Sequence, residues 1–245
     1  MPELSVGQVT RMNFFTMVIV ALLLLATSAT ANSGSANEIR MAVSTHGFNV
    51  GDIVSRYSRK DEGGQELLHY TSHTRINANF LVVSYALESD EEALIGPEGT
   101  RSYKKRWLEN GLRHQVEAKI QGGAFSCVST GSDNAVRTLN IPRDSYDYTI
   151  MDCPELHIPH EGDTLTVRLL DMETCEVVTR NYHWVRSERF KVNGVTDLYR
   201  VIDFRDRNKT GTRWILPDAL GAKIARQDGT SAKGTYSVRA VDAGR

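Results

Sequence analysis

Residues 103–120 read Tyr-Lys-Lys-Arg-Trp-Leu-Glu-Asn-Gly-Leu-Arg-His-Gln-Val-Glu-Ala-Lys-Ile, and this stretch predicts a β-hairpin. Asn110-Gly111 favours a two-residue turn, because both residues tolerate the positive φ angles that a type I′ turn requires. Such a turn fixes how the two strands align. The cross-strand pairs expected from it are Glu109–Leu112, Trp107–His114, Lys105–Val116 and Tyr103–Ala118.

The two sides of this hairpin differ in chemistry. One side is apolar and comprises Tyr103, Trp107, Leu112, Val116, Ala118 and Ile120. The other is charged or polar and comprises Lys104, Arg106, Arg113, Gln115, Glu117 and Lys119, with Lys104 opposite Glu117. Such alternation is typical of an antiparallel sheet that has one buried face and one solvated face.

Similar short runs recur along the chain, with turn residues every 8–12 positions and no convincing amphipathic helix. Besides the hairpin, strands are expected at 39–45, 53–59, 66–76, 80–87, 124–129, 135–141, 164–170, 176–185, 190–192, 195–204, 212–216, 222–227 and 235–241. The acidic stretch 89–100 predicts a surface loop, and 142–162 predicts a long ordered crossover. The fold class is therefore all-β and mainly antiparallel: a strongly curved, meandering sheet like a half-barrel, with a two-sheet sandwich as the alternative.

Residues 1–31 have the features of a signal peptide. Arg11 precedes an apolar run at 14–26, and Ala29-Thr30-Ala31 forms a small-x-small cleavage site. A transmembrane anchor is the alternative, but the run is shorter than the ~20 apolar residues that a spanning helix needs. Cleavage would leave residues 32–245 as a single β-rich domain, periplasmic or secreted, with no membrane span.

Composition limits the partners and the redox chemistry. The formal net charge is -1, so there is no basic excess to hold a nucleic acid. Three cysteines, Cys127, Cys153 and Cys175, fall in a chain whose export would permit disulfides. A Cys127–Cys153 bridge is expected, with Cys175 exposed in a turn; three free or buried thiols are the alternative.

Several aromatic motifs resemble a known group of proteins. The motifs are Tyr103-x3-Trp107-x3-Gly111-Leu112, Tyr146-Asp147-Tyr148-Thr149, Leu169-Leu170-Asp171-x2-Thr174-x-Glu176-Val177-Val178, Trp214 and Thr235-Tyr236-Ser237-Val238. In this order they resemble an uncharacterised family of exported bacterial proteins, known only as a domain of unknown function. The resemblance spans roughly 41–241. It implies an antiparallel half-barrel similar to the lipoprotein-localisation carriers and to a small violacein-pathway enzyme that works without a cofactor.

The chain departs from that family at two positions. Lys105 stands where the family pattern has a glutamate, and Cys175 stands where it has a glycine. The first departure puts any shared polar site near Trp107 in doubt. The resemblance supplies no established catalytic residues.

A half-barrel has a concave face that can hold an apolar ligand if side chains do not fill it. The candidate ligand-binding residues are Tyr103, Trp107, His114, Tyr148 and Trp214. The competing interpretation is that these aromatic residues belong to the core, where large aromatic side chains usually lie.

Motifs for catalysis and cofactor binding are lacking. The sequence has no Gly-x-Ser-x-Gly, no dinucleotide-binding or Walker pattern and no Cys-x-x-Cys, so no cofactor is expected. His157-x-x-His160 lies in a proline-flanked loop without a full ligand set, and no metal site is expected. The leading hypothesis is a binding or carrier-like module for a lipid-like ligand or a cell-envelope partner. A cofactor-free enzyme and a structural or assembly component of the envelope are the alternatives.

Overall fold

The computed structural model describes residues 37–80, 83–218, 221–231 and 234–241. Within these ranges, fifteen strands form one continuous sheet. The expected signal peptide, 1–31, lies outside the described residues.

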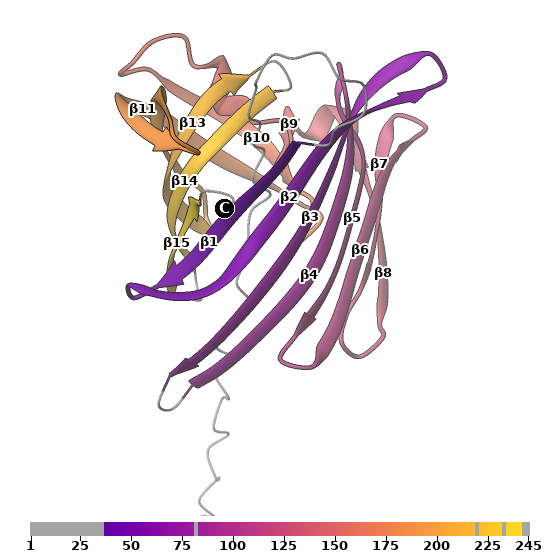
Figure 1. Cartoon of the computed structure of the whole chain (residues 1–245). Coiled ribbons are helices and arrows are strands. Elements are labelled where there is room, and N and C mark those ends of the chain that lie inside the picture. Colours follow the sequence, from indigo (N-terminus) through magenta and orange to yellow (C-terminus); the bar gives the residue numbers. More distant parts are fainter. Residues whose placement is uncertain (1–36, 81–82, 219–220, 232–233, 242–245) are drawn as a thin grey trace, which may run out of the picture.

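The strands fall into two series along the chain (Figure 1). The first series is β1 (Asn37–Thr45), β2 (Phe48–Glu62), β3 (Gln65–Phe80), β4 (Val83–Gly96), β5 (Gly99–Glu109), β6 (Leu112–Gln121), β7 (Ala124–Thr130) and β8 (Val136–Pro142). The second is β9 (Tyr148–Thr149), β10 (Thr164–Asp171), β11 (Glu176–Val192), β12 (Val195–Arg205), β13 (Lys209–Asp218), β14 (Gly221–Ser231) and β15 (Gly234–Ala240). Two short 3-10 turns, η1 (Arg143–Ser145) and η2 (Pro154–His157), flank β9.

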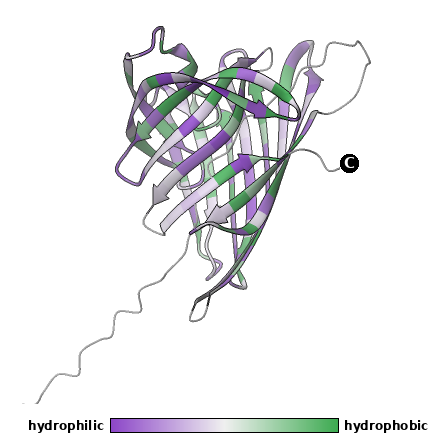
Figure 2. Ribbon diagram, turned by 60° about the vertical axis from the view of Figure 1, so that its left-hand side comes forward, coloured by the Kyte–Doolittle hydropathy of each residue, from purple (hydrophilic) through white to green (hydrophobic). Residues whose placement is uncertain are grey.

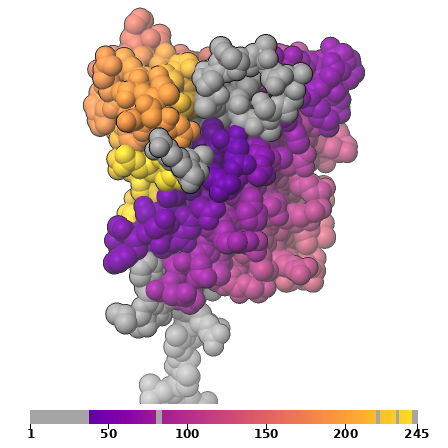
Figure 3. All heavy atoms as spheres, in the orientation of Figure 1, coloured from indigo at the N-terminus to yellow at the C-terminus, as the bar shows by residue number. Residues whose placement is uncertain are grey.

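The sheet is a double meander joined through its first and last strands. Its order runs from β8 back to β1, crosses to β15 and continues back to β9. Neighbouring strands are antiparallel except β9 and β10, which are parallel. Strands β2–β8 form a wide curved wall, and β10–β15 curl into a second lobe beside it (Figures 1 and 3). The sheet stays open between β8 and β9, which confirms the predicted curved half-barrel.

The hairpin of β5 and β6 has the predicted alignment. Glu109 faces Leu112, Trp107 faces His114, Lys105 faces Val116 and Tyr103 faces Ala118. Asn110 and Gly111 adopt positive φ angles of 49° and 83°. The Asn110 side chain also accepts a hydrogen bond from the Ala86 amide at 2.9 Å, so the turn is anchored to β4.

The prediction of a loop at 89–100 was wrong. Residues up to Gly96 continue β4, and β5 begins at Gly99. Exposed and buried positions alternate here, as a half-solvated strand requires. Ser89, Glu91 and Ala93 are buried, whereas Glu88, Asp90 and Glu92 point outward and pair with residues of β3. The acidic residues thus obscured the alternation of buried and exposed positions that is typical of a strand.

The core lies mainly on the concave face, and hydrophobic and hydrophilic residues alternate along the strands (Figure 2). A second, smaller cluster covers the opposite face of β11–β14, because neighbouring residues of one strand point to opposite sides. It comprises Phe190, Val192, Tyr199, Val201, Trp214 and Ala225.

The disulfide differs from the one expected. Cys127 of β7 pairs with Cys175, with a Cα–Cα distance of 6.3 Å, and Cys153 is a buried free thiol. Cys175 lies in the turn between β10 and β11, at a φ of 56°, and is buried rather than exposed. This turn packs against the wall formed by β5–β7, a proximity that spacing along the sequence cannot reveal.

Candidate functional site

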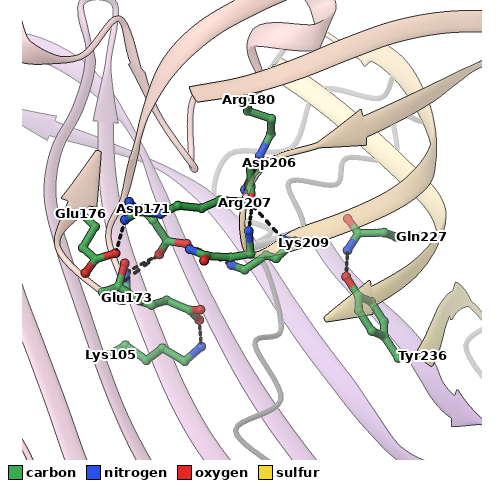
Figure 4. A network of polar contacts seen from close by, with 12 residues as sticks. Lys105, Asp171, Glu173, Glu176, Arg180, Asp206, Arg207, Lys209, Gln227 and Tyr236 are labelled. Carbon is green, nitrogen blue, oxygen red and sulfur yellow. Dashed lines mark hydrogen bonds and ion pairs between the residues drawn. The ribbon is translucent and has the colours of Figure 1, made fainter. Parts of the chain in front are cut away.

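Ion pairs fill the interior between the wall and the second lobe (Figure 4). Lys105 of β5 pairs with Glu173, and Lys209 of β13 donates to Asp171 at 3.0 Å. Arg180 pairs with Asp206, and Arg213 pairs with Glu155. All eight side chains are at least nine-tenths buried. We call these residues the interior ion network.

The turn between β10 and β11 supplies two of the carboxylates. Asp171 Oδ1 accepts the backbone amide of Glu173 at 3.0 Å, and that of Thr174 at 3.4 Å. These bonds hold the turn in the shape that Asp residues commonly stabilise. Asp171 Oδ2 remains for Lys209, and Glu173 reaches across to Lys105.

A second branch of the network extends from β13 to β14 and β15. Arg213 Nε donates to Gln227 Oε1 at 2.8 Å, and Gln227 Nε2 donates to the Tyr236 hydroxyl at 2.8 Å. Arg213 also binds Glu155 of η2. The network therefore fixes η2, β13, β14 and β15 relative to one another.

Burial and charge shift several pKa values in this interior. Burial raises the pKa of Glu91; Lys105 partly opposes that effect, and Glu173 adds to it. Burial alone would lower the pKa of Lys105, but the carboxylates of Glu173 and Glu91 outweigh it and raise that pKa. Burial alone would raise the pKa of Asp171, but the Lys209 ammonium outweighs this effect and lowers that pKa.

Lys105 with Glu173 and Lys209 with Asp171 are held as opposite charges beside one another, which is how proteins tolerate charge in a low-dielectric interior. Tyr103, on the same face, has a pKa raised well above the usual value by burial and by Glu91. It is therefore neutral at physiological pH. The network therefore links the packing of the two lobes.

The five candidate ligand-binding residues do not converge on one pocket. Tyr103 is buried in the interior beside the network. Tyr148 of β9 stacks on His157, with ring centroids 5.5 Å apart. Trp214 lies in the second cluster, under the Arg226 guanidinium at 4.6 Å. Their role in binding stays a prediction.

Trp107 and His114 are brought together. Their rings stack with centroids 5.0 Å apart and an interplanar angle of 12°. Both lie on the concave face, because they alternate with outward-facing Arg106 and Gln115, which hydrogen bond to each other. Along that face of β6, Val116 and Ala118 are buried, whereas His114 is half-buried and Leu112 is 54% exposed.

Trp107, Leu112 and His114 therefore form a partly open patch at the turn end of the β5–β6 hairpin, which we call the aromatic lip. A separate cavity of about 380 Å³ lies near β9 and is bordered by Leu68, Tyr148 and His157 among others. A void of only about 20 Å³ is bordered by Val43, Ile76 and Tyr85. Two larger cavities have mixed linings, and Trp107 and His114 border the second of them. One of about 720 Å³ is bordered by residues of β10–β15, and one of about 550 Å³ by residues of β4–β7 and the following loop.

Sequence reasoning missed the interior ion network, although one signal for it was present. The expected hairpin alignment places Lys105 on the same side as Tyr103 and Trp107. A lysine there requires a buried partner. The partner itself, Glu173, is 68 residues away and could not be identified from the pattern.

Metal ligation and membrane spanning find no support in residues 37–80, 83–218, 221–231 and 234–241. No group of three or more His, Cys, Asp or Glu side chains there could hold a metal ion. In the same residues, no helix is long and apolar enough to cross a membrane.

Comparison with known proteins identifies a likeness of fold. No family model matches the chain, and no curated protein matches it. Among solved structures, a β-barrel-like protein of the domain of unknown function DUF1849 from Brucella abortus is similar, with a TM-score of 0.56 and 7% sequence identity. The similarity covers 84% of this chain and 96% of that chain. It supports the barrel-like fold expected from the sequence, and at this identity it concerns the fold alone.

Proposed function

We propose that the protein is an exported binding module that holds an amphipathic, lipid-like ligand at the aromatic lip. The observation that carries this proposal is the Trp107–His114 stack, half-buried at the turn end of the β5–β6 hairpin and bordering a cavity of about 550 Å³. Stacked aromatic rings beside the exposed Leu112 offer an apolar surface.

The proposed location has its own support. The Cys127–Cys175 disulfide links the wall to the second lobe, and stable disulfides are characteristic of compartments outside the reducing cytosol. The test is to express the full chain in a bacterium and fractionate the cells. A periplasmic product that begins at Asn32 is expected. A cytoplasmic product that retains residues 1–31 would contradict export.

Tryptophan fluorescence tests the ligand site. The chain has three tryptophans, Trp107, Trp184 and Trp214. The wild-type protein and the Trp107→Phe variant would be titrated with lysophosphatidylcholine and with palmitate, each below its micelle concentration. A saturable emission change in the wild type, absent in Trp107→Phe, is expected.

Two controls make the titration decisive. Trp184→Phe removes a tryptophan that stacks under Arg200, away from the lip, and should keep the signal. Native mass spectrometry should show one added ligand mass on the wild type and on Trp184→Phe, and none on Trp107→Phe. If both amphiphiles leave the emission and the mass unchanged, the proposal of a lipid-like ligand is wrong. A partner segment would then be sought by pull-down from envelope extracts.

A further inference from the structure

Strand β8 is an open edge of the sheet. It ends the strand order, and the described part of the chain supplies no strand on its other side. In Figure 1 it runs along the right-hand margin of the molecule, beyond β7. Its residues are mostly exposed, and Val136 is 66% exposed.

The backbone groups available at this edge follow from the pairing with β7. Hydrogen bonds join Gly131 to Ala135 at one end of the hairpin and Arg143 to Gly123 at the other, each at 3.1 Å. In an antiparallel pair, bonded and non-bonded residue pairs alternate. The bonded pairs between those ends are therefore Ser129–Arg137, Cys127–Leu139 and Phe125–Ile141.

The even-numbered residues of β8 consequently direct their N–H and C=O groups away from β7. These residues are Val136, Thr138 and Asn140. Pro142 follows the same alternation but has no N–H, and its carbonyl accepts the Ser145 hydroxyl at 2.7 Å. Three consecutive bonding positions thus face outward before the edge ends.

This edge lacks the usual protection against pairing with another strand. Edge strands are commonly blunted by inward charges, bulges or proline. The pairing of β8 with β7 is regular, its only charged residue is Arg137, and its proline is the last residue. Exposed apolar residues also concentrate near this side. Five of the nine in the described residues lie on β5–β8: Leu108, Leu112, Ile120, Val128 and Val136.

We propose that β8 docks onto β8 of a second copy of this chain, in antiparallel orientation about a twofold axis at Thr138. In that register Thr138 faces Thr138 of the second copy, and Val136 faces Asn140. All three outward-facing positions then form hydrogen bonds with the second copy. Pro142, which has no N–H, lies outside the paired residues. The arrangement is isologous, as a closed dimer requires.

The side chains suit this self-pairing. Opposed threonines are a favourable cross-strand pair. Arg137 faces Leu139 of the other copy rather than its own counterpart, so like charges are not directly opposed. A seven-residue edge is a small interface, which places the dimer among weak, concentration-dependent assemblies.

Analytical ultracentrifugation of the mature chain over rising concentration tests the association. A monomer–dimer equilibrium is expected for the wild type. Thr138→Pro should be monomeric at concentrations where the wild type dimerises, because it removes the N–H at the centre of the new ladder and leaves the β7 ladder intact. Thr138→Val keeps that N–H and should dimerise. A wild type that stays monomeric at every concentration would overturn the proposal.

Cysteine cross-linking tests the register independently of Thr138→Pro. A bonded pair places opposed Cα atoms about 5.5 Å apart, within the range of a disulfide. Thr138→Cys should therefore form a covalent dimer on mild oxidation. Val136→Cys should not, because its counterpart lies four residues along the strand, about 13 Å away. Equal cross-linking of both variants, or of neither, would contradict the register.

Discussion

Lys105 and Glu173 form an ion pair between the two lobes of the sheet, with side chains only 8% and 9% exposed. Lys105 comes from β5 in the wide wall, and Glu173 from the turn between β10 and β11. The Cys127–Cys175 disulfide joins the same turn to β7. One short turn is therefore attached to the wall by a charge pair and by a covalent bond.

Replacing Lys105 with alanine should destabilise the protein strongly. The substitution leaves Glu173 and the neighbouring Glu91 buried without their cation, and breaking a buried pair in this way typically costs about 3–5 kcal/mol. The adjacent Lys104 is a matched control, since it pairs with Glu117 on the solvated face, where both side chains are more than a third exposed. Lys104→Ala should cost about 0–1 kcal/mol. Urea unfolding of both variants measures the difference, and equal losses would contradict the buried role of Lys105.

Glu91→Gln should make the protein more stable at neutral pH. Burial raises the pKa of Glu91 in the folded state above its value of about 4.3 in the unfolded chain. The folded protein then binds the proton more tightly, so this group's contribution to stability is present below pH ~4.3 and is lost as pH rises through the folded pKa.

The measurement is urea unfolding of the wild type and of Glu91→Gln at several pH values from 4 to 8. The stability advantage of the variant should grow with pH and then level off. Glu92→Gln, on the exposed side of the same strand, should show no such trend. A Glu91→Gln variant whose advantage does not change with pH would show that Glu91 ionises equally easily in both states.

Removal of the disulfide should lower the free energy of unfolding by about 4 kcal/mol, because the bridge closes a 48-residue loop of the unfolded chain. The double variant Cys127→Ser/Cys175→Ser would be compared with the wild type by denaturant unfolding. Dithiothreitol should reduce the stability of the wild type and leave the double variant unchanged. A wild type whose stability dithiothreitol leaves unchanged would contradict the role of the bridge.

Gly51→Ala should destabilise by at least about 1–3 kcal/mol, the usual cost of overpacking. A Cβ at this position of β2 would lie 2.0 Å from the Arg75 carbonyl oxygen, which belongs to the backbone of β3. Gly96→Ala is the control, because the nearest atom there, at 3.0 Å, belongs to the flexible Arg101 side chain. Thermal unfolding compares the two. Equal melting temperatures would mean that β2 and β3 separate at little cost.

Turn chemistry made much of the fold predictable. Asn110-Gly111 and Asn193-Gly194 both adopt positive φ angles. Each connects the two strands of a hairpin that the sequence predicted. A local turn determines which residues face each other, so the alignment of β5 with β6 could be derived without knowing the rest of the molecule.

The sequence could not predict contacts between distant segments. The pairing of Cys127 with Cys175 and of Lys105 with Glu173 depends on how the β10–β11 turn meets the wall. Strand length was also underestimated. Two separate strands were expected where β11 runs from Glu176 to Val192 through a bulge near Trp184. Of the candidate site, the sequence predicted only that Trp107 and His114 face each other across the hairpin.

The pairing of β1 with β15 has a consequence for the order of assembly. Every strand from β2 to β8 can add to the strand before it as the chain emerges, because each pairs with its neighbour in sequence. One edge of β1 pairs with β2, but its other edge can pair only after β15, the last strand described, has been made. Pairings between segments so distant in sequence form slowly. Until then β1 is a bare edge open to wrong partners. Loss of β15 during synthesis would leave two further unpaired edges, at β1 and at β14, because β15 pairs with both strands.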